Sequence, residues 1–119
     1  MTHKFVVSNV PGYLSESILA HAEACRPQEC CGLVIRTHQH CRYIPCTNFA
    51  ASPCQNFVIS PEDFLHATTN GEILALVHSH PEGPSSLSEA DKTTQRLSNC
   101  DWWLVCEDTI HCFGIEDDD

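Results

Sequence analysis

One of the two longest unbroken apolar runs in the chain, residues 73–77, has the length of one buried β-strand, and it constrains the fold more than any other feature. A helix that crosses a bilayer needs roughly 18 consecutive apolar residues, so this run is far too short for one. Turn-forming residues bound it on both sides, with Asn70 and Gly71 before it and the prolines 81 and 84 after it. The sequence therefore predicts a central buried strand over residues 72–80.

Strand and helix patterns alternate on both sides of this strand. Further strands are predicted over residues 30–36, 41–47, 57–59, 102–106 and 110–113, the last two as a hairpin. One helical stripe comprises Leu14, Ile18, Ala22 and Cys25, with Ser15 as N-cap. Two further helices are predicted over residues 61–70, capped by Ser60, and 88–99, with Ala90, Thr94 and Leu97 on one side. This alternation predicts an α/β or α+β fold with helices flanking one mixed sheet, as a single domain over residues 1–119 with an acidic, disordered tail at 116–119.

The charge and cysteine content narrow the range of partners. Sixteen acidic against six basic residues give a net charge of −10. A surface this negative repels phosphate backbones and anionic lipids, so we expect neither nucleic acid nor membrane as a partner. The N-terminus lacks a cationic stretch followed by an apolar block, and the nine cysteines are an odd number. Both features favour a cytoplasmic protein with reduced thiols over a secreted one with a disulfide framework.

The segment with the clearest chemistry is His78-Ser79-His80-Pro81. Residues two apart on a strand point to the same side, so two imidazoles can converge on one metal ion. Asp91 follows in the first turn of the next predicted helix. Two histidines and a carboxylate leave a fourth tetrahedral position for water, which is the open arrangement of a catalytic zinc. The sequence thus predicts one zinc ion per chain, held by His78, His80 and Asp91.

Water activated in this way also needs a proton acceptor. Glu29 is the candidate, at the start of the predicted strand in Glu29-Cys30-Cys31-Gly32. Gly32 has no side chain, so we expect another backbone segment to approach closely there. By default, however, a glutamate after the turn at Pro27 is a solvated loop residue, because no local spacing forces it toward the histidines.

Together these segments resemble the motif of the JAMM (MPN+) metallopeptidases. The elements E-x-C-G, H-S-H-P and S-x-x-D occur here in that order, at Glu29–Gly32, His78–Pro81 and Ser88–Asp91. The resemblance implies a three-layer fold related to cytidine deaminase and hydrolysis of peptide or isopeptide bonds in a protein or peptide substrate. It also implies the roles: zinc ligands at His78, His80 and Asp91, a general acid/base at Glu29, and oxyanion stabilisation by Ser88.

A narrower resemblance concerns the segments 60–63, 71–73, 75–81, 87–91 and 102–106. They are similar to the N-terminal half of a family of tail assembly proteins from lambda-like phages. This implies a role in tail assembly in the bacterial host cytoplasm, with phage tail proteins as possible partners. Members of that family usually continue into an NlpC-type cysteine peptidase domain, so we expect this chain to be a fragment, a truncated gene product or a stand-alone version.

Several alternatives stay open at this point. Ser88 and Asp91 also fit a helix capping box, as do Ser60 and Asp63 elsewhere in the chain. A second H-x-H, His38 and His40, falls in a predicted hairpin turn and is interpreted as exposed turn residues. The whole chain could be a non-catalytic assembly module that uses the metal, or only the fold, for structure. It could also be an isopeptidase that acts on small modifiers or sulfur carriers. The sequence does not predict an oligomeric state.

Overall fold

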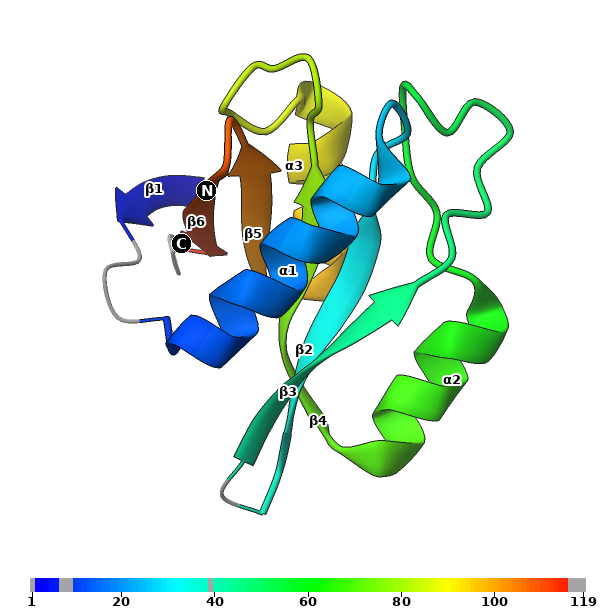
Figure 1. Cartoon of the computed structure of the whole chain (residues 1–119), viewed down its shortest axis with the longest axis vertical. Helices are drawn as coiled ribbons and strands as arrows, with labels where there is room; N and C mark the ends of the chain where they lie inside the picture. Colours follow the sequence, from blue (N-terminus) through cyan, green and yellow to red (C-terminus); the bar gives the residue numbers. More distant parts are fainter. Residues whose placement is uncertain (1, 7–9, 39, 116–119) are drawn as a thin grey trace.

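The computed structural model describes residues 2–6, 10–38 and 40–115, so the predicted tail at 116–119 lies outside the described residues. Three helices and a six-stranded sheet make up the described part (Figure 1). The helices are α1 (Gly12–Cys25), α2 (Pro61–Asn70) and α3 (Glu89–Ser98). The strands are β1 (Thr2–Val6), β2 (Cys31–Thr37), β3 (His40–Cys46), β4 (Glu72–Ser79), β5 (Asp101–Cys106) and β6 (Thr109–Ile115). No helix in these ranges is long and apolar enough to span a bilayer.

The sheet is mixed, with the strand order β1-β6-β5-β4-β2-β3. Strands β4 and β5 are parallel, whereas every other pairing is antiparallel. Two parallel neighbours require a crossover connection, and α3 provides it. The carboxyl end of β4 and the N-terminus of α3 therefore meet at one edge of the sheet, where the chain turns from strand to helix.

Helices cover both faces of the sheet, which confirms the three-layer prediction. On one face, α1 packs Leu14, Ile18 and Ala22 against sheet residues such as Val34 and Val77. On the other face, Ala67 of α2 joins a second cluster that includes Leu33, Ile35, Trp102 and Leu104. The adjacent residues Cys30 and Cys31 belong to opposite clusters, because neighbouring strand residues point to opposite faces. Each sheet face thus has its own apolar core.

Two local predictions were wrong, and one strand was missed. Helix α1 begins at Gly12 with Pro11 at the N-cap, so Ser15 lies inside the first turn and donates its hydroxyl to the Gly12 carbonyl instead of capping. The segment 57–59 is no strand; Ile59 forms only an isolated bridge with Asn48. Strand β1, at the sheet edge, was not predicted at all.

Gly32 makes room for a side chain and not for a second backbone segment, contrary to expectation. A Cβ atom placed there would overlap the ring and hydroxyl of Tyr43 on the neighbouring strand. The Tyr43 hydroxyl lies 2.6 Å from Nδ1 of His21 on α1. The glycine thus allows the Tyr43 ring to lie flat against β2 while its hydroxyl reaches the helix.

Helix α3 buries a polar residue where an apolar face was predicted. Leu97 is 83% exposed, and Ala90 and Thr94 are also exposed. Gln95 is instead fully buried and donates through Nε2 to the Phe113 carbonyl at 2.6 Å. A buried hydrogen bond from a side-chain amide to a backbone carbonyl is costly to lose. This contact therefore ties α3 to β6 and keeps the Gln95 side of the helix toward the sheet.

Candidate metal centre

The predicted metal ligands lie at the junction between β4 and α3. His78 is the penultimate residue of β4 and pairs with Cys31 of β2 and Leu104 of β5. His80 follows the strand, and its amide donates to the Val105 carbonyl at 3.0 Å. Both imidazoles are buried, with exposures of 0% and 8%. The sheet therefore holds both backbones rigidly, and the spacing of two residues directs both rings to one side.

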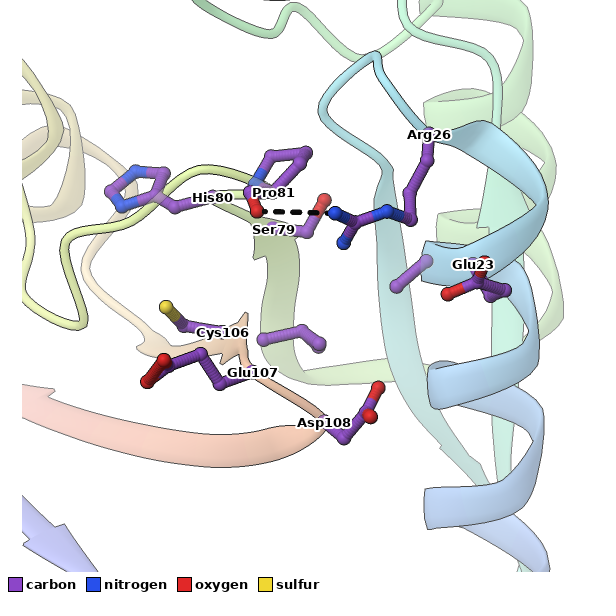
Figure 2. Close-up of a pocket in the computed structure, with 10 residues that line it drawn as sticks. Glu23, Arg26, Ser79, His80, Pro81, Cys106, Glu107 and Asp108 are labelled. Carbon is purple, nitrogen blue, oxygen red and sulfur yellow. Dashed lines mark hydrogen bonds between the residues drawn. The ribbon is translucent and has the colours of Figure 1, made fainter.

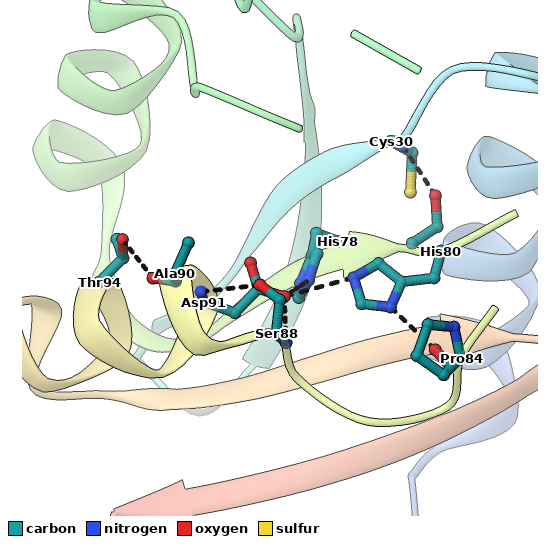
Figure 3. A network of polar contacts seen from close by, with 9 residues as sticks. Cys30, His78, His80, Pro84, Ser88, Ala90, Asp91 and Thr94 are labelled. Atoms are coloured by element: carbon teal, nitrogen blue, oxygen red, sulfur yellow. Dashed lines mark hydrogen bonds and ion pairs between the residues drawn. The ribbon is translucent and has the colours of Figure 1, made fainter. Parts of the chain in front are cut away.

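The two rings converge on the carboxylate of Asp91 from the first turn of α3 (Figure 3). Oδ2 of Asp91 lies 3.3 Å from Nε2 of His78 and 3.3 Å from Nε2 of His80. Zinc ligands at 2.0–2.1 Å on a tetrahedron stand about 3.3–3.4 Å apart, so these separations match two edges of such a site. They are also within reach of a long hydrogen bond or ion pair between imidazole and carboxylate, which is how the three groups interact in the absence of an ion. The spacing of the ligand atoms thus fits a shared cation.

The hydrogen bonds of His80 fix which of its nitrogens can bind a metal. Its Nδ1 lies 2.8 Å from the Pro84 carbonyl oxygen, which can only accept, so Nδ1 carries a proton. The lone pair of the neutral ring is then on Nε2, the atom that faces Asp91. An outer hydrogen bond of this kind is the usual partner of a metal-binding histidine.

Asp91 and Ser88 also form the capping box of α3. The Ser88 hydroxyl accepts from the Asp91 amide, and Asp91 Oδ2 accepts from the Ser88 amide, both at 3.0 Å. The two interpretations of S-x-x-D therefore coexist, because one carboxylate oxygen faces both the helix end and the imidazoles. Ser60, in the similar sequence before α2, makes no side-chain cap, and Asp63 accepts from the Thr47 amide instead.

Glu29 lies beside the histidines, although it precedes β2 by two residues. One ligand atom each from Glu29, His78 and His80 lie within 4.8 Å of one another. Glu29 is only 7% exposed, so it is no solvated loop residue. By distance, the group that could hold a cation is thus Glu29, His78 and His80, with the Asp91 carboxylate beside both imidazoles. A set of two imidazoles and two carboxylates is chemically suited to zinc.

Asn48 fixes the backbone around Glu29, and the sequence analysis missed it. Its Nδ2 donates to the carbonyls of Glu29 and Asn56 at 3.0 Å and to that of Pro53 at 3.3 Å. Its Oδ1 accepts from the amides of Ala50 and Val58. The Glu29 amide in turn donates to the Pro53 carbonyl at 2.8 Å. An asparagine in a loop carries no sequence signal for such a role, since all these contacts depend on how the segment 48–58 folds back.

The electrostatic environment separates the two carboxylates. Burial raises the pKa of Glu29 to about 7, with His80 opposing the shift and Asp91 adding to it. Burial also disfavours the charged form of Asp91, but hydrogen bonds with His78 and His80 outweigh it and hold the Asp91 pKa far below its usual range. Burial lowers the pKa of His78. At neutral pH, Asp91 is therefore an anion suited to a cation, while Glu29 can accept and release a proton.

Two hollows adjoin this cluster. The first, here called the cleft, has a volume of about 540 Å³, and its walls include Glu29, Cys54, His80, Ser88 and Asp91. The second, here called the apolar groove, has about 390 Å³ and lies between α2 and α3; its walls include Phe57, Phe64, Leu76, Thr94 and Trp102. Both share Asn56, Ala90 and Asp91, so the groove continues the cleft.

A third cavity lies beside Ser79 and His80 at the end of β4, between α1 and the β5–β6 turn (Figure 2). It holds only about 20 Å³, although Arg26, Ser79 and Glu107 line it. Such a volume accommodates about one water molecule. This cavity is therefore too small to admit a substrate, whereas the cleft, lined by Glu29, His80 and Asp91, is large enough. The second H-x-H pair, His38 and His40, is exposed beside the β2–β3 turn, as predicted.

Comparison with known proteins agrees with this geometry. Tail tip assembly protein K of Escherichia phage N15 is 41% identical over 90 residues, which are 76% of this chain and 37% of that protein. Its counterpart in Escherichia phage lambda is 60% identical over 55 residues, which are 46% of this chain and 28% of that protein. The matched part of this chain thus spans about a third of each phage protein's length.

A solved structure and a family model extend the comparison. The solution structure of protein DSY2949 from Desulfitobacterium hafniense has a TM-score of 0.67 and 28% identity, covering 80% of this chain and 71% of that one. The model of prokaryotic homologs of the JAB domain matches residues 11–114, a range that includes α1, the metal cluster and the β5–β6 hairpin. The predicted resemblance is therefore confirmed, and the chain belongs to the family of prokaryotic homologs of the JAB domain.

Proposed function

We propose that this chain is a zinc-dependent peptidase that hydrolyses peptide or isopeptide bonds. The observation that carries the proposal is the convergence of the Nε2 atoms of His78 and His80 on Oδ2 of Asp91, 3.3 Å from each, beside the buried carboxylate of Glu29. His78, His80 and Asp91 would hold the ion. When bound, zinc lowers the pKa of a water molecule and polarises a carbonyl oxygen.

Glu29 would move the protons of the reaction. A carboxylate whose pKa is raised to about 7 by burial can take a proton from attacking water and later give it to the leaving amine. Asn48 binds the Glu29 carbonyl and Pro53 accepts from the Glu29 amide, so the backbone that carries this side chain is held beside the histidines. Glu29 thus serves first as a base and then as an acid at one position.

Ser88 would stabilise the negative charge that develops on the substrate carbonyl oxygen. Its hydroxyl lies at the wall of the cleft and accepts from the Asp91 amide, which leaves its own proton to donate. The substrate would lie as an extended peptide in the cleft, with an apolar side chain toward the adjoining groove. The cleft and groove together are large enough for several residues.

The phage relatives are tail tip assembly proteins, and this supports tail proteins as partners or substrates. It also supports a second candidate function, a non-catalytic assembly module that keeps the metal for structure. The two differ in what they require of Glu29: proton transfer needs its carboxyl group, whereas an assembly module with a structural metal does not.

A cleavage assay tests the proposal. Peptides that tile the tail proteins of the phages N15 and lambda, with Gly-Gly isopeptide conjugates as a further set, are incubated with zinc-loaded protein and analysed by mass spectrometry. We expect cleavage by the wild type and a loss of at least about 100-fold in Glu29→Gln, the contribution typical of a general acid/base. Glu16→Gln, on the exposed side of α1, is the matched control. Tail assembly that proceeds normally with Glu29→Gln, together with no cleavage of any peptide, would support the assembly module instead.

A further inference from the structure

The two proposed histidine ligands are supported in different ways. His80 donates its Nδ1 proton to the Pro84 carbonyl, which fixes the orientation of the ring. Nδ1 of His78 is buried and has no hydrogen-bond partner among the described residues. Metal-binding histidines almost always use the second ring nitrogen in such a bond, and losing it typically costs 10–100-fold in affinity. Something else must therefore hold the His78 ring in place.

Two aromatic rings enclose His78. The Phe57 ring stacks on it, with centroids 4.7 Å apart and an angle of 28° between the planes. The Trp102 ring meets it edge-on, at 5.2 Å and 73°. Phe57 and Trp102 also contact each other, at 5.6 Å and 62°. Any tilt or rotation of the imidazole would therefore disrupt its packing against Phe57 or Trp102.

The position of Phe57 is itself fixed. Asn48 binds both flanking residues, through the Asn56 carbonyl at 3.0 Å and the Val58 amide at 3.1 Å. Asn48 makes both contacts through its side-chain amide and also donates to the Glu29 carbonyl, so Phe57 and Glu29 share one anchor. The Phe57 ring is partly buried and lines the apolar groove, whereas Trp102 is fully buried in the core. Phe57 can thus be changed at less cost to the fold than Trp102.

We propose that Phe57 is a positioning residue of the metal centre, whose ring holds the His78 imidazole in the plane that directs Nε2 toward the ion. The inference rests on the proposed metal centre and adds a residue outside its ligand set. One aromatic pair contributes enough to change an equilibrium about 2- to 12-fold, and we expect the zinc affinity to weaken by that factor when the ring is removed. Phe57 touches no substrate bond in this role and acts through His78.

The test measures metal affinity and metal geometry, and it needs no substrate. Zinc dissociation constants are determined by competition with a chromophoric chelator for wild type, Phe57→Ala, Phe57→Leu and Phe57→Tyr. Absorption spectra of the cobalt(II)-loaded proteins report the ligand geometry. We expect weaker zinc binding and a changed cobalt spectrum in Phe57→Ala and Phe57→Leu. Phe57→Tyr keeps the ring, so its zinc affinity and cobalt spectrum should match those of the wild type. Phe49→Ala, at a phenylalanine that is 69% exposed in the same loop, is the matched control and should bind like the wild type.

The outcomes distinguish the inference from the proposed function. Wild-type zinc affinity and an unchanged cobalt spectrum in Phe57→Leu would overturn the role of Phe57 while leaving the metal centre intact. Zinc affinities of His78→Ala and His80→Ala equal to that of the wild type would overturn the metal centre itself. Phe57→Leu keeps apolar volume, so it decides the question even where Phe57→Ala fails to fold.

Discussion

The double role of the Ser88–Asp91 pair leads to a prediction that separates helix capping from metal binding. Asp91→Asn keeps an oxygen that can accept from the Ser88 amide but removes the carboxylate that faces His78 and His80. Ser88→Ala removes the hydroxyl that accepts from the Asp91 amide but keeps the carboxylate. The two substitutions therefore act on one short segment, but only Asp91→Asn should reduce the affinity for zinc.

The magnitudes follow from the contacts. Loss of an N-cap side chain costs about 0.5–2 kcal/mol, so Ser88→Ala should lower the melting temperature by roughly 3–6 °C for each kcal/mol lost in a chain of this size. Its zinc affinity should stay within about threefold of the wild type, since all proposed ligands remain. Asp91→Asn should weaken zinc binding by at least about 100-fold, because even an outer-sphere partner contributes 10–100-fold. Its metal-free melting temperature should also fall, because the carboxylate contacts with His78 and His80 that lower the Asp91 pKa are lost.

Thermal unfolding with and without zinc measures both quantities in one experiment. Bound metal raises the melting temperature in proportion to RT ln(1 + [zinc]/Kd), so the zinc-induced shift reports affinity. Both variants should melt at a lower temperature than the wild type without zinc, but Ser88→Ala should keep the full zinc-induced shift, whereas Asp91→Asn should lose it. Equal losses of the zinc-induced shift in both variants would refute the reasoning, as would a full shift in Asp91→Asn.

Three further substitutions or modifications test the surroundings of the site. Gly32→Ala should destabilise the protein by about 1–3 kcal/mol in urea unfolding, because the new methyl group displaces the Tyr43 ring. Gln95→Ala should cost about 1–3 kcal/mol and also weaken zinc binding, because α3 loses its buried tie to the sheet and carries Asp91 with it. An alkylating reagent at pH 8 should label the exposed Cys54 long before Cys46, whose pKa burial raises to about 12, as peptide mapping can show.

Each of these has a matched control in the same chain. Gly12→Ala, where no atom lies within 4 Å of the new methyl group, should not destabilise the protein. Leu97→Ala, at the exposed side of α3, should change stability by less than about 0.5 kcal/mol. Stability losses as large as those of Gly32→Ala and Gln95→Ala in these controls would contradict the packing argument, and equal labelling rates for Cys46 and Cys54 would contradict the burial argument.

The sequence predicted those parts of the site that depend on local periodicity. The spacing of His78 and His80 implies a shared side wherever residues 72–80 form a strand, and the observed β4 follows that range closely. The position of Asp91 in the first turn of α3 follows from the capping pattern at Ser88. Glu29 could be proposed only from the family resemblance, because its approach to the histidines depends on the pairing of β2 with β4.

The parts that could not be predicted depend on contacts between distant segments. Asn48 and Phe57 acquire their roles only when the segment 48–58 folds back over the end of β2 and toward β4. The apolar pattern of α3 was misleading, since the helix turns Gln95 and not Leu97 toward the sheet. From this buried position Gln95 binds the backbone carbonyls of Phe113 and Cys100, and periodicity alone cannot anticipate such contacts.

Anomalous diffraction at the zinc absorption edge, from crystals of the zinc-loaded protein, tests the central claim most directly. We predict one strong peak per chain, within about 2.0–2.2 Å of Nε2 of His78, Nε2 of His80 and a carboxylate oxygen of Asp91. A peak found only at the exposed pair His38 and His40, or none at the β4–α3 junction in protein saturated with zinc, would contradict the account.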